Sequence, residues 1–240
     1  ALNSAAPLFD VHRARRHVKR YGAARKSTQS AGKGAAMGNK RVVLASASPR
    51  RSELLRQIGL VPEILVSHVE EKVSSRIPSQ VVMELARQKA EDVAQGMDPG
   101  VIVIGADTVV AVDGRILGKP SDHEEAYQMA CLLQGRRHQV YTGVCMIQKA
   151  ADGGKDQKTV FYDETDVEVE PMSEEELREY SRMEEPMDKA GAYAVQGYFA
   201  RYIKGMNGSY ANVMGLPVHR VYQELKLLGF WEQAEEREHD

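Results

Sequence analysis

The stretch VIVIGADTVVAVDGRIL, residues 101–117, restricts the fold of this chain more than any other part of the sequence. Its first four residues, Val101–Ile104, form an unbroken apolar run, which is typical of a strand buried on both faces of a sheet. Asp113-Gly114 follows between VVAV and RIL, and this dipeptide predicts a tight β-hairpin turn. We therefore expect a sheet that is covered on both sides and contains at least one antiparallel pair.

Further runs of β-prone residues predict the other strands. Two of these runs are long and enclose a loop rich in Gly, Asp and Lys at 151–158, so they predict a second antiparallel pair. The predicted strands besides 101–104 cover residues 42–45, 64–66, 139–148, 159–169 and 199–203.

Capping residues predict where the helices begin. Ser48 and Pro49 suit the N-cap and first turn of a helix that Gly59 can end, and Ser79 suits the N-cap of a second helix. The inward face of that second helix is expected to carry Val82, Leu85, Ala86, Lys89, Ala90 and Val93. Two Ser-x-x-Glu capping boxes, at Ser121/Glu124 and Ser173/Glu176, predict two more helices, and a last one covers about 218–228.

Strands and helices thus alternate along the chain without internal repeats. This order predicts an α/β fold with a mixed, twisted sheet and flanking helices. We expect one globular unit over residues 41–230 and a charged tail at 231–240.

Residues 1–40 form an N-terminal extension whose first 36 residues hold eight of the 32 Lys and Arg but one of the 34 Asp and Glu. This composition suits an organelle transit peptide. The interpretation we favour is a disordered or tag-derived extension, with Met37 opening the globular part. We otherwise expect a cytoplasmic protein.

Composition also excludes several classes of partner. No apolar run approaches the roughly 20 residues that span a bilayer, so we expect no membrane insertion. The acidic body after residue 36 is a poor binder of nucleic acid polymers. Cys131 and Cys145 lack a CxxC or Cys/His spacing, which argues against zinc and favours free thiols in a reducing compartment.

Two arginines occupy the first turn of the predicted helix at 49–58. Arg50 and Arg51 carry the wrong sign of charge for this position, because a helix N-terminus is itself partly positive. The placement becomes favourable if an anion binds there, with the hydroxyls of Ser46 and Ser48 beside the free N–H groups. A solvated surface turn is the alternative.

Acidic and basic residues elsewhere suit a metal and a phosphate. Asp107 interrupts an apolar strand, and Gly105 suggests a turn at the strand end, where ligands gather in α/β sheets. Glu71, beside Glu70, could supply a second carboxylate for Mg²⁺. Lys89 lies on an otherwise apolar helix face and Lys119 follows the hairpin. Each of these residues alone also fits an ordinary turn or surface.

Eight motifs, taken in their order, resemble the Maf family of nucleotide pyrophosphatases over roughly residues 41–228. They are LASASPRRSELLRQIG, VEEKV, ARQKA, VIGADTVV, ILGKP, VYTGV, PMDKAGAYAVQG and GSYANVMGLP. The resemblance implies hydrolysis of a nucleoside triphosphate to monophosphate and pyrophosphate with Mg²⁺ or Mn²⁺. It also implies two lobes around a deep cleft, a fold similar to inosine triphosphate pyrophosphatases, and often a homodimer.

Matching the family's motifs residue by residue implies roles for nine side chains. Catalytic roles fall to Asp107, Glu71 and Lys119, with Asp107 and Glu71 as the metal ligands. Substrate-binding roles fall to Ser46, Arg50, Arg51, Lys89, Thr108 and Gln196. Arg50, Thr108 and Gln196 resemble the branch that acts on dTTP and UTP, whereas the branch for methylated guanine nucleotides carries Trp, Gln and Glu. Glu70 departs from the usual Asp.

Three functions remain open at this stage. The first is a pyrophosphatase that cleanses the nucleotide pool, with Asp107 as general base and no covalent intermediate. The second is a non-catalytic nucleotide-binding regulator of cell division and septum formation, which would not need both carboxylates. The third is a phosphatase or diphosphatase for another nucleotide.

Overall fold

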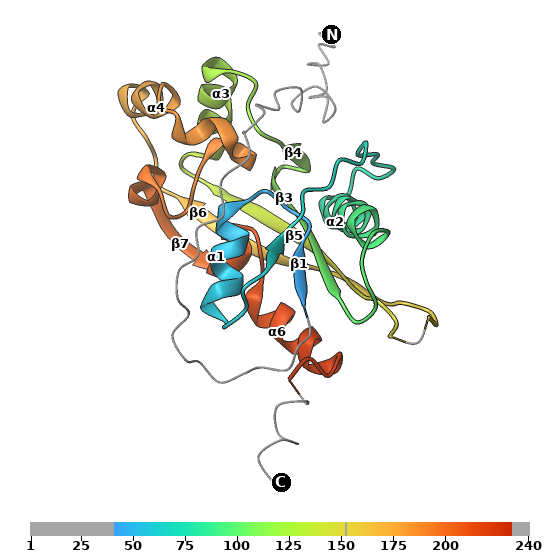
Figure 1. Cartoon of the computed structure of the whole chain (residues 1–240). Helices are drawn as coiled ribbons and strands as arrows, with labels where there is room; N and C mark the ends of the chain where they lie inside the picture. Colours follow the sequence, from blue (N-terminus) through green and yellow to red (C-terminus); the bar gives the residue numbers. More distant parts are fainter. Residues whose placement is uncertain (1–40, 152, 232–240) are drawn as a thin grey trace, which may run out of the picture.

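The computed structural model describes residues 41–151 and 153–231 (Figure 1). Within these ranges the chain forms one seven-stranded sheet, six α-helices and three short 3₁₀ helices. The α/β class and the mixed sheet are therefore confirmed. Predictions for residues 1–40 and 232–240 lie outside the described residues.

The sheet has the strand order β2-β1-β3-β5-β6-β7, and β4 pairs with β3 beside this path. β1 runs parallel to β2 and β3, whereas β3, β5, β6 and β7 are antiparallel to their neighbours. The strands are β1 (Val42–Leu44), β2 (Glu63–Ile64), β3 (Ile102–Val112), β4 (Arg115–Leu117), β5 (Arg137–Gln148), β6 (Gln157–Val169) and β7 (Ile203–Asn207).

Helices cover both faces of one half of the sheet (Figure 1). α2 (Pro78–Ala94) packs with Val43 and Val103, while α1 (Pro49–Gln57) and α6 (Val218–Leu227) pack with the alternate positions on the other face. This is the arrangement expected when successive strand residues point to opposite faces. The first half of β3 is therefore buried on both sides, as predicted.

The other half of the long strands has its own core. There α3 (His123–Leu133) and α4 (Glu174–Ser181) pack on β3, β5 and β6 together with the 3₁₀ helices η2 (Glu185–Asp188), η3 (Ala190–Ala192) and η4 (Tyr198–Tyr202). Tyr180 and Phe199 are the largest fully buried side chains of this core. The chain thus has two packed lobes that share one sheet, as the resemblance implied.

The prediction of a turn at Gly105 is wrong, because β3 continues through it to Val112. Its glycine instead serves helix packing: a Cβ atom at Gly105 would lie 2.4 Å from the carbonyl oxygen of Ala86 in α2. Gly143, on β5, is equally close to α2. The absence of two side chains lets α2 lie directly on the sheet and brings Lys89 to β3.

We expect Gly143→Ala to destabilise the fold by about 1–3 kcal/mol, the usual cost of overpacking a core. The added Cβ would lie 2.3 Å from the carbonyl group of Val82, which is backbone and cannot rotate away. Denaturant unfolding measures the free energy. Gly205→Ala in β7 is the matched control, since nothing lies within 4 Å of its Cβ position. Equal stability of wild type and Gly143→Ala would show that α2 is free to shift.

Local signals predicted some helix ends and the β3–β4 hairpin turn correctly. Ser173 and Glu176 form the reciprocal capping box of α4, and Asp113 and Gly114 adopt positive φ in the β3–β4 hairpin. Gly59, at φ 83, directly follows the C-cap of α1.

Other ends differ from the prediction. Ser79 lies inside α2, which begins at Pro78, because proline suits the first helical turn. Asp122, not Ser121, caps α3 by accepting a hydrogen bond from the backbone N–H of Glu125. Residues 199–203 form mainly η4 rather than a strand, and 203–207 form β7. In this part of the chain α5 (Tyr210–Met214) was not predicted.

Cys131 and Cys145 are both free thiols, half-buried and buried respectively. None of the helices in the described ranges combines the length and the apolar character that a bilayer crossing requires.

Candidate functional site

A cavity of about 1020 Å³ lies between the two lobes, where β1 ends. β1 pairs with β3 only as far as Ile104, and β4 joins the same strand at Val110. Among the described residues, no strand pairs with Gly105–Val109 on that side of β3. The carboxyl end of a parallel strand thus opens onto the middle of β3, the place where α/β sheets bind ligands.

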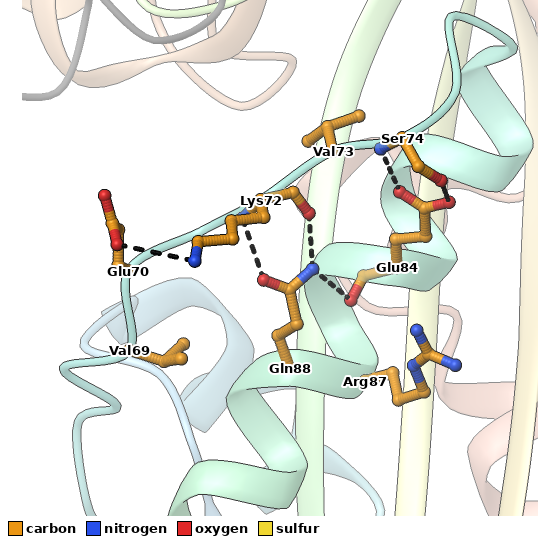
Figure 2. Close-up of a pocket in the computed structure, with 8 residues that line it drawn as sticks. All are labelled: Val69, Glu70, Lys72, Val73, Ser74, Glu84, Arg87 and Gln88. Atoms are coloured by element: carbon orange, nitrogen blue, oxygen red, sulfur yellow. Dashed lines mark hydrogen bonds and ion pairs between the residues drawn. The ribbon is translucent and has the colours of Figure 1, made fainter.

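All nine residues singled out by the sequence line this cavity. They are Ser46, Arg50, Arg51, Glu71, Lys89, Asp107, Thr108, Lys119 and Gln196. Their gathering is a structural observation, whereas their individual roles stay predictions. Glu70 does not belong to the group: its side chain is exposed and pairs with Lys72 on the neighbouring surface (Figure 2).

Asp107 and Glu71 meet at a single ammonium group. Lys89 Nζ lies 2.5 Å from Asp107 Oδ1 and 3.1 Å from Glu71 Oε1. The side chains of Lys89 and Asp107 are only 15% and 6% exposed, so these charges lie in a partly desolvated environment where pairing matters. The lysine predicted on the apolar face of α2 therefore points into the cavity, and its charge is shared by both acids.

Thr108 points to the opposite face of β3 and meets Arg51. The Arg51 guanidinium donates to Thr108 Oγ1 at 3.0 Å, to Ser46 Oγ at 2.9 Å and, through Nε, to the carbonyl oxygen of Gly215 at 2.8 Å. Three protein acceptors thus fix the orientation of this cation. Thr108, predicted as a substrate contact, is placed to orient Arg51.

The helix start that carries the two arginines is built differently from the prediction. Ser48 occupies the N-cap position of α1, but its side chain makes no capping hydrogen bond. Ser46 Oγ instead accepts from the backbone N–H of Ser48. Arg50 is held less firmly than Arg51, since its nearest ion-pair partner, Asp188, lies 3.9 Å away.

A buried polar chain behind Thr108 escaped the sequence reasoning. Thr142 Oγ1 hydrogen-bonds Thr108 Oγ1 and donates to the carbonyl oxygen of Asn212, whose amide group donates to Val140 and Thr165. The available signal was the segment GSYANVMGLP, which we used only as a family motif. Its Gly215, at φ 115, brings backbone close to the Arg51 side chain.

Gln196 is exposed on the cavity wall, and a carboxylate missed by the sequence reasoning holds the adjoining backbone. Glu185 accepts from the N–H groups of Tyr198 and Phe199 and from the Tyr180 hydroxyl. A Cβ atom at Gly197 would overlap this carboxylate. The backbone that follows Gln196 is thus held by a partly buried hydrogen-bond network.

His138 is a buried core residue and takes no part in the cavity lining. Its Nε2 lies 2.8 Å from the Tyr193 hydroxyl, and burial lowers its pKa to about 4. The ring is therefore neutral near pH 7. His68 is exposed on the loop before α2.

The donor set of the cavity fits Mg²⁺ or Mn²⁺. Asp107 and Glu71 bring two carboxylates to one cation, Lys89, and these hard oxygen ligands suit such metals. No group of three or more His, Cys, Asp or Glu side chains that could hold a metal occurs in the described ranges. Mg²⁺ commonly needs only one or two carboxylates, because substrate phosphates complete its shell.

Most of this chain is similar in sequence to known proteins. The sequence model of a family described as Maf-like protein matches residues 41–228. A dTTP/UTP pyrophosphatase of Agathobacter rectalis is 49% identical over 202 residues, covering 78% of this chain and 97% of that protein. One from Lachnoclostridium phytofermentans is 46% identical over 188 residues, covering 78% and 95%. The Staphylococcus aureus Ham1 structure is 20% identical with a TM-score of 0.39, covering 54% and 72% of the chains; the predicted likeness to inosine triphosphate pyrophosphatases stays a prediction.

Proposed function

The chain belongs to the Maf family, and on that basis we propose that it hydrolyses a nucleoside triphosphate, dTTP or UTP, to the monophosphate and pyrophosphate. The observation that carries the proposal is the cavity at the end of β1. It joins two carboxylates on one side of β3 to an anchored guanidinium on the other.

The size and charge of the cavity suit a nucleotide. About 1020 Å³ is at the upper end of ordinary ligand sites. Arg50, Arg51 and Lys119 bring positive charge to its wall, and the acidic remainder of the chain explains why anion binding needs such a local cluster. These cations neutralise the triphosphate and the charge that develops on the leaving pyrophosphate.

Asp107 acts as the general base in this proposal. Its carboxylate takes a proton from a water molecule whose oxygen attacks the α-phosphorus. The bond between the α-phosphorus and the bridging oxygen breaks, and pyrophosphate leaves with that oxygen. Lys89 orients the Asp107 carboxylate by direct contact. No covalent enzyme intermediate is required.

Asp107 and Glu71 would hold the divalent metal. When bound, Mg²⁺ or Mn²⁺ supplies charge neutralisation at the phosphate oxygens and orients the substrate. The residues of the chain supply what else the reaction needs. These are the anchored positive charge of Arg51, the other cations at the cavity wall, and the second carboxylate, Glu71.

Gln196 is proposed to select the base. Its amide group can donate to a pyrimidine carbonyl and accept from the pyrimidine N3–H. Glu185 fixes the backbone beside it, so the amide is presented from a constant position. A role in removing unwanted nucleotides from the pool follows from such selection.

Product analysis tests the proposed function. The protein is incubated with dTTP or UTP and Mg²⁺, and the products are separated by chromatography. We expect monophosphate and pyrophosphate. Diphosphate and phosphate would indicate a different phosphatase. Binding without turnover would indicate a regulator, and either result would contradict the proposal. A panel of canonical and modified triphosphates then defines the base.

A further inference from the structure

The segment between β2 and α2 is irregular but closely attached to the helix. Residues 65–76 contain no regular secondary structure, and Glu71 lies near their middle. Figure 2 shows this segment running beside α2, with helix side chains reaching across to its backbone. The position of Glu71 in the cavity therefore depends on how this segment is held.

Three polar side chains of α2, spaced four residues apart, bind the backbone of the segment. Residues with this spacing lie on one helix face. Their contacts are Glu84 with the N–H and hydroxyl of Ser74, Gln88 with the backbone of Lys72, and Asp92 with the Ser67 hydroxyl and the His68 N–H. Each tether includes at least one backbone group of the segment, so the segment is fixed irrespective of most of its own side chains.

Gln88 is the tether beside Glu71, and it binds at two points. Its Oε1 accepts from the Lys72 N–H at 2.9 Å, and its Nε2 donates to the Lys72 carbonyl oxygen at 2.6 Å. The side-chain amide thus pairs with Lys72 as a neighbouring strand would. The N–H that it binds belongs to the peptide group joining Glu71 to Lys72, so Gln88 fixes the backbone from which the Glu71 carboxylate extends.

The next residue of the helix completes the arrangement. Lys89 contacts the Glu71 carboxylate directly, while Gln88 holds the backbone behind it. Both ends of Glu71 are therefore located by consecutive residues of α2, a helix that Gly105 and Gly143 allow to lie directly on the sheet.

We propose that Gln88 is a positioning residue that places the Glu71 carboxylate beside Asp107, and so forms the two-carboxylate metal site. This inference rests on the proposed function. Gln88 does not line the cavity, and so touches neither substrate nor metal. Its effect is exerted through Glu71, as outer-shell partners of metal ligands act elsewhere.

The test replaces Gln88 by a side chain of similar length that cannot form these hydrogen bonds. Gln88→Met is compared with Gln80→Met, because Gln80 tethers the same segment from the same helix, but at Ser75, farther along the chain from Glu71. Mn²⁺ binding to the nucleotide-free protein is measured by electron paramagnetic resonance, and kcat for dTTP is measured across a Mg²⁺ titration. Thermal unfolding checks that both variants are folded.

We expect Gln88→Met to weaken Mn²⁺ binding by about 10–100-fold and to move the Mg²⁺ midpoint upward by a similar factor, the range found for outer-shell partners. Gln80→Met leaves both within about twofold. Equal metal affinity in Gln88→Met and wild type, whatever their stability, would overturn the inference and reduce Gln88 to a structural tether.

The two proposals fail differently. If the wild type binds Mn²⁺ but hydrolyses no triphosphate, the proposed function fails, and the Mn²⁺ affinities of the two variants alone decide the role of Gln88. If the wild type neither binds Mn²⁺ nor hydrolyses triphosphates, both proposals are overturned.

Discussion

Asp107→Asn is expected to lower kcat for dTTP hydrolysis by about 10²–10⁴-fold, the usual contribution of a general base. The amide has the shape of the carboxylate but cannot take a proton from water, and it removes the charge that Lys89 contacts. Steady-state kinetics with Mg²⁺ measure the loss. Because the phosphate-binding cations are untouched, affinity for a non-hydrolysable dTTP analogue should change by only a few-fold.

Asp113→Asn is the matched control for this variant. Asp113 lies at the far end of the same strand, in the exposed hairpin, where its carboxylate pairs with Arg136. Exposed pairs of this kind contribute little to stability, so kcat should be unchanged. Full activity of Asp107→Asn would rule out Asp107 as the base, and equal losses in both variants would point to a general effect on the protein.

Features of the fold that depend on a few neighbouring residues were predicted correctly from the sequence. The Asp113-Gly114 turn and the Ser173/Glu176 capping box depend on a few neighbouring residues, and both occur as predicted. Gly105 was misinterpreted because its reason lies elsewhere in the chain, in the close approach of Ala86. Such helix-on-sheet contacts leave no trace in a short window of sequence.

The candidate site shows the same contrast between signals that are visible in the local sequence and contacts between distant segments. Charged residues in unusual places, such as Asp107 in an apolar strand and Lys89 on an apolar helix face, indicated the cavity side chains correctly. The neutral residues that orient them were not found, because Thr142 and Gln88 are unremarkable in sequence. Hydrogen bonds between distant segments define their importance, as the Gln88 tether to Lys72 illustrates.

Arg51 explains why two arginines are tolerated at a helix N-terminus. Its guanidinium donates to acceptors of three other residues, Ser46, Thr108 and Gly215. These bonds leave from three different nitrogens of the planar guanidinium, whereas a lysine carries its three donors on a single nitrogen. The positive charge is thus held in place before substrate arrives, which reduces the cost of ordering it on binding.

Arg51→Lys is therefore expected to lower kcat/KM for dTTP by about 10–100-fold although the net charge is unchanged. Hydrogen bonds of charged groups contribute about 1.5–3 kcal/mol, and about 1.4 kcal/mol corresponds to a tenfold change in rate. Steady-state kinetics check the value. Arg50→Lys should have a smaller effect, because the polar contact of the Arg50 guanidinium within the described ranges is the 3.9 Å ion pair with Asp188.

Arg56→Lys, in the last turn of the same helix and exposed, controls for the exchange itself and should leave kcat/KM unchanged. If Arg51→Lys kept the kcat/KM of the wild type, charge alone would suffice at this position. The fixed geometry provided by Ser46, Thr108 and Gly215 would then have no catalytic value. A loss confined to Arg51→Lys would instead show that the orientation of the guanidinium, and not merely its charge, supports turnover.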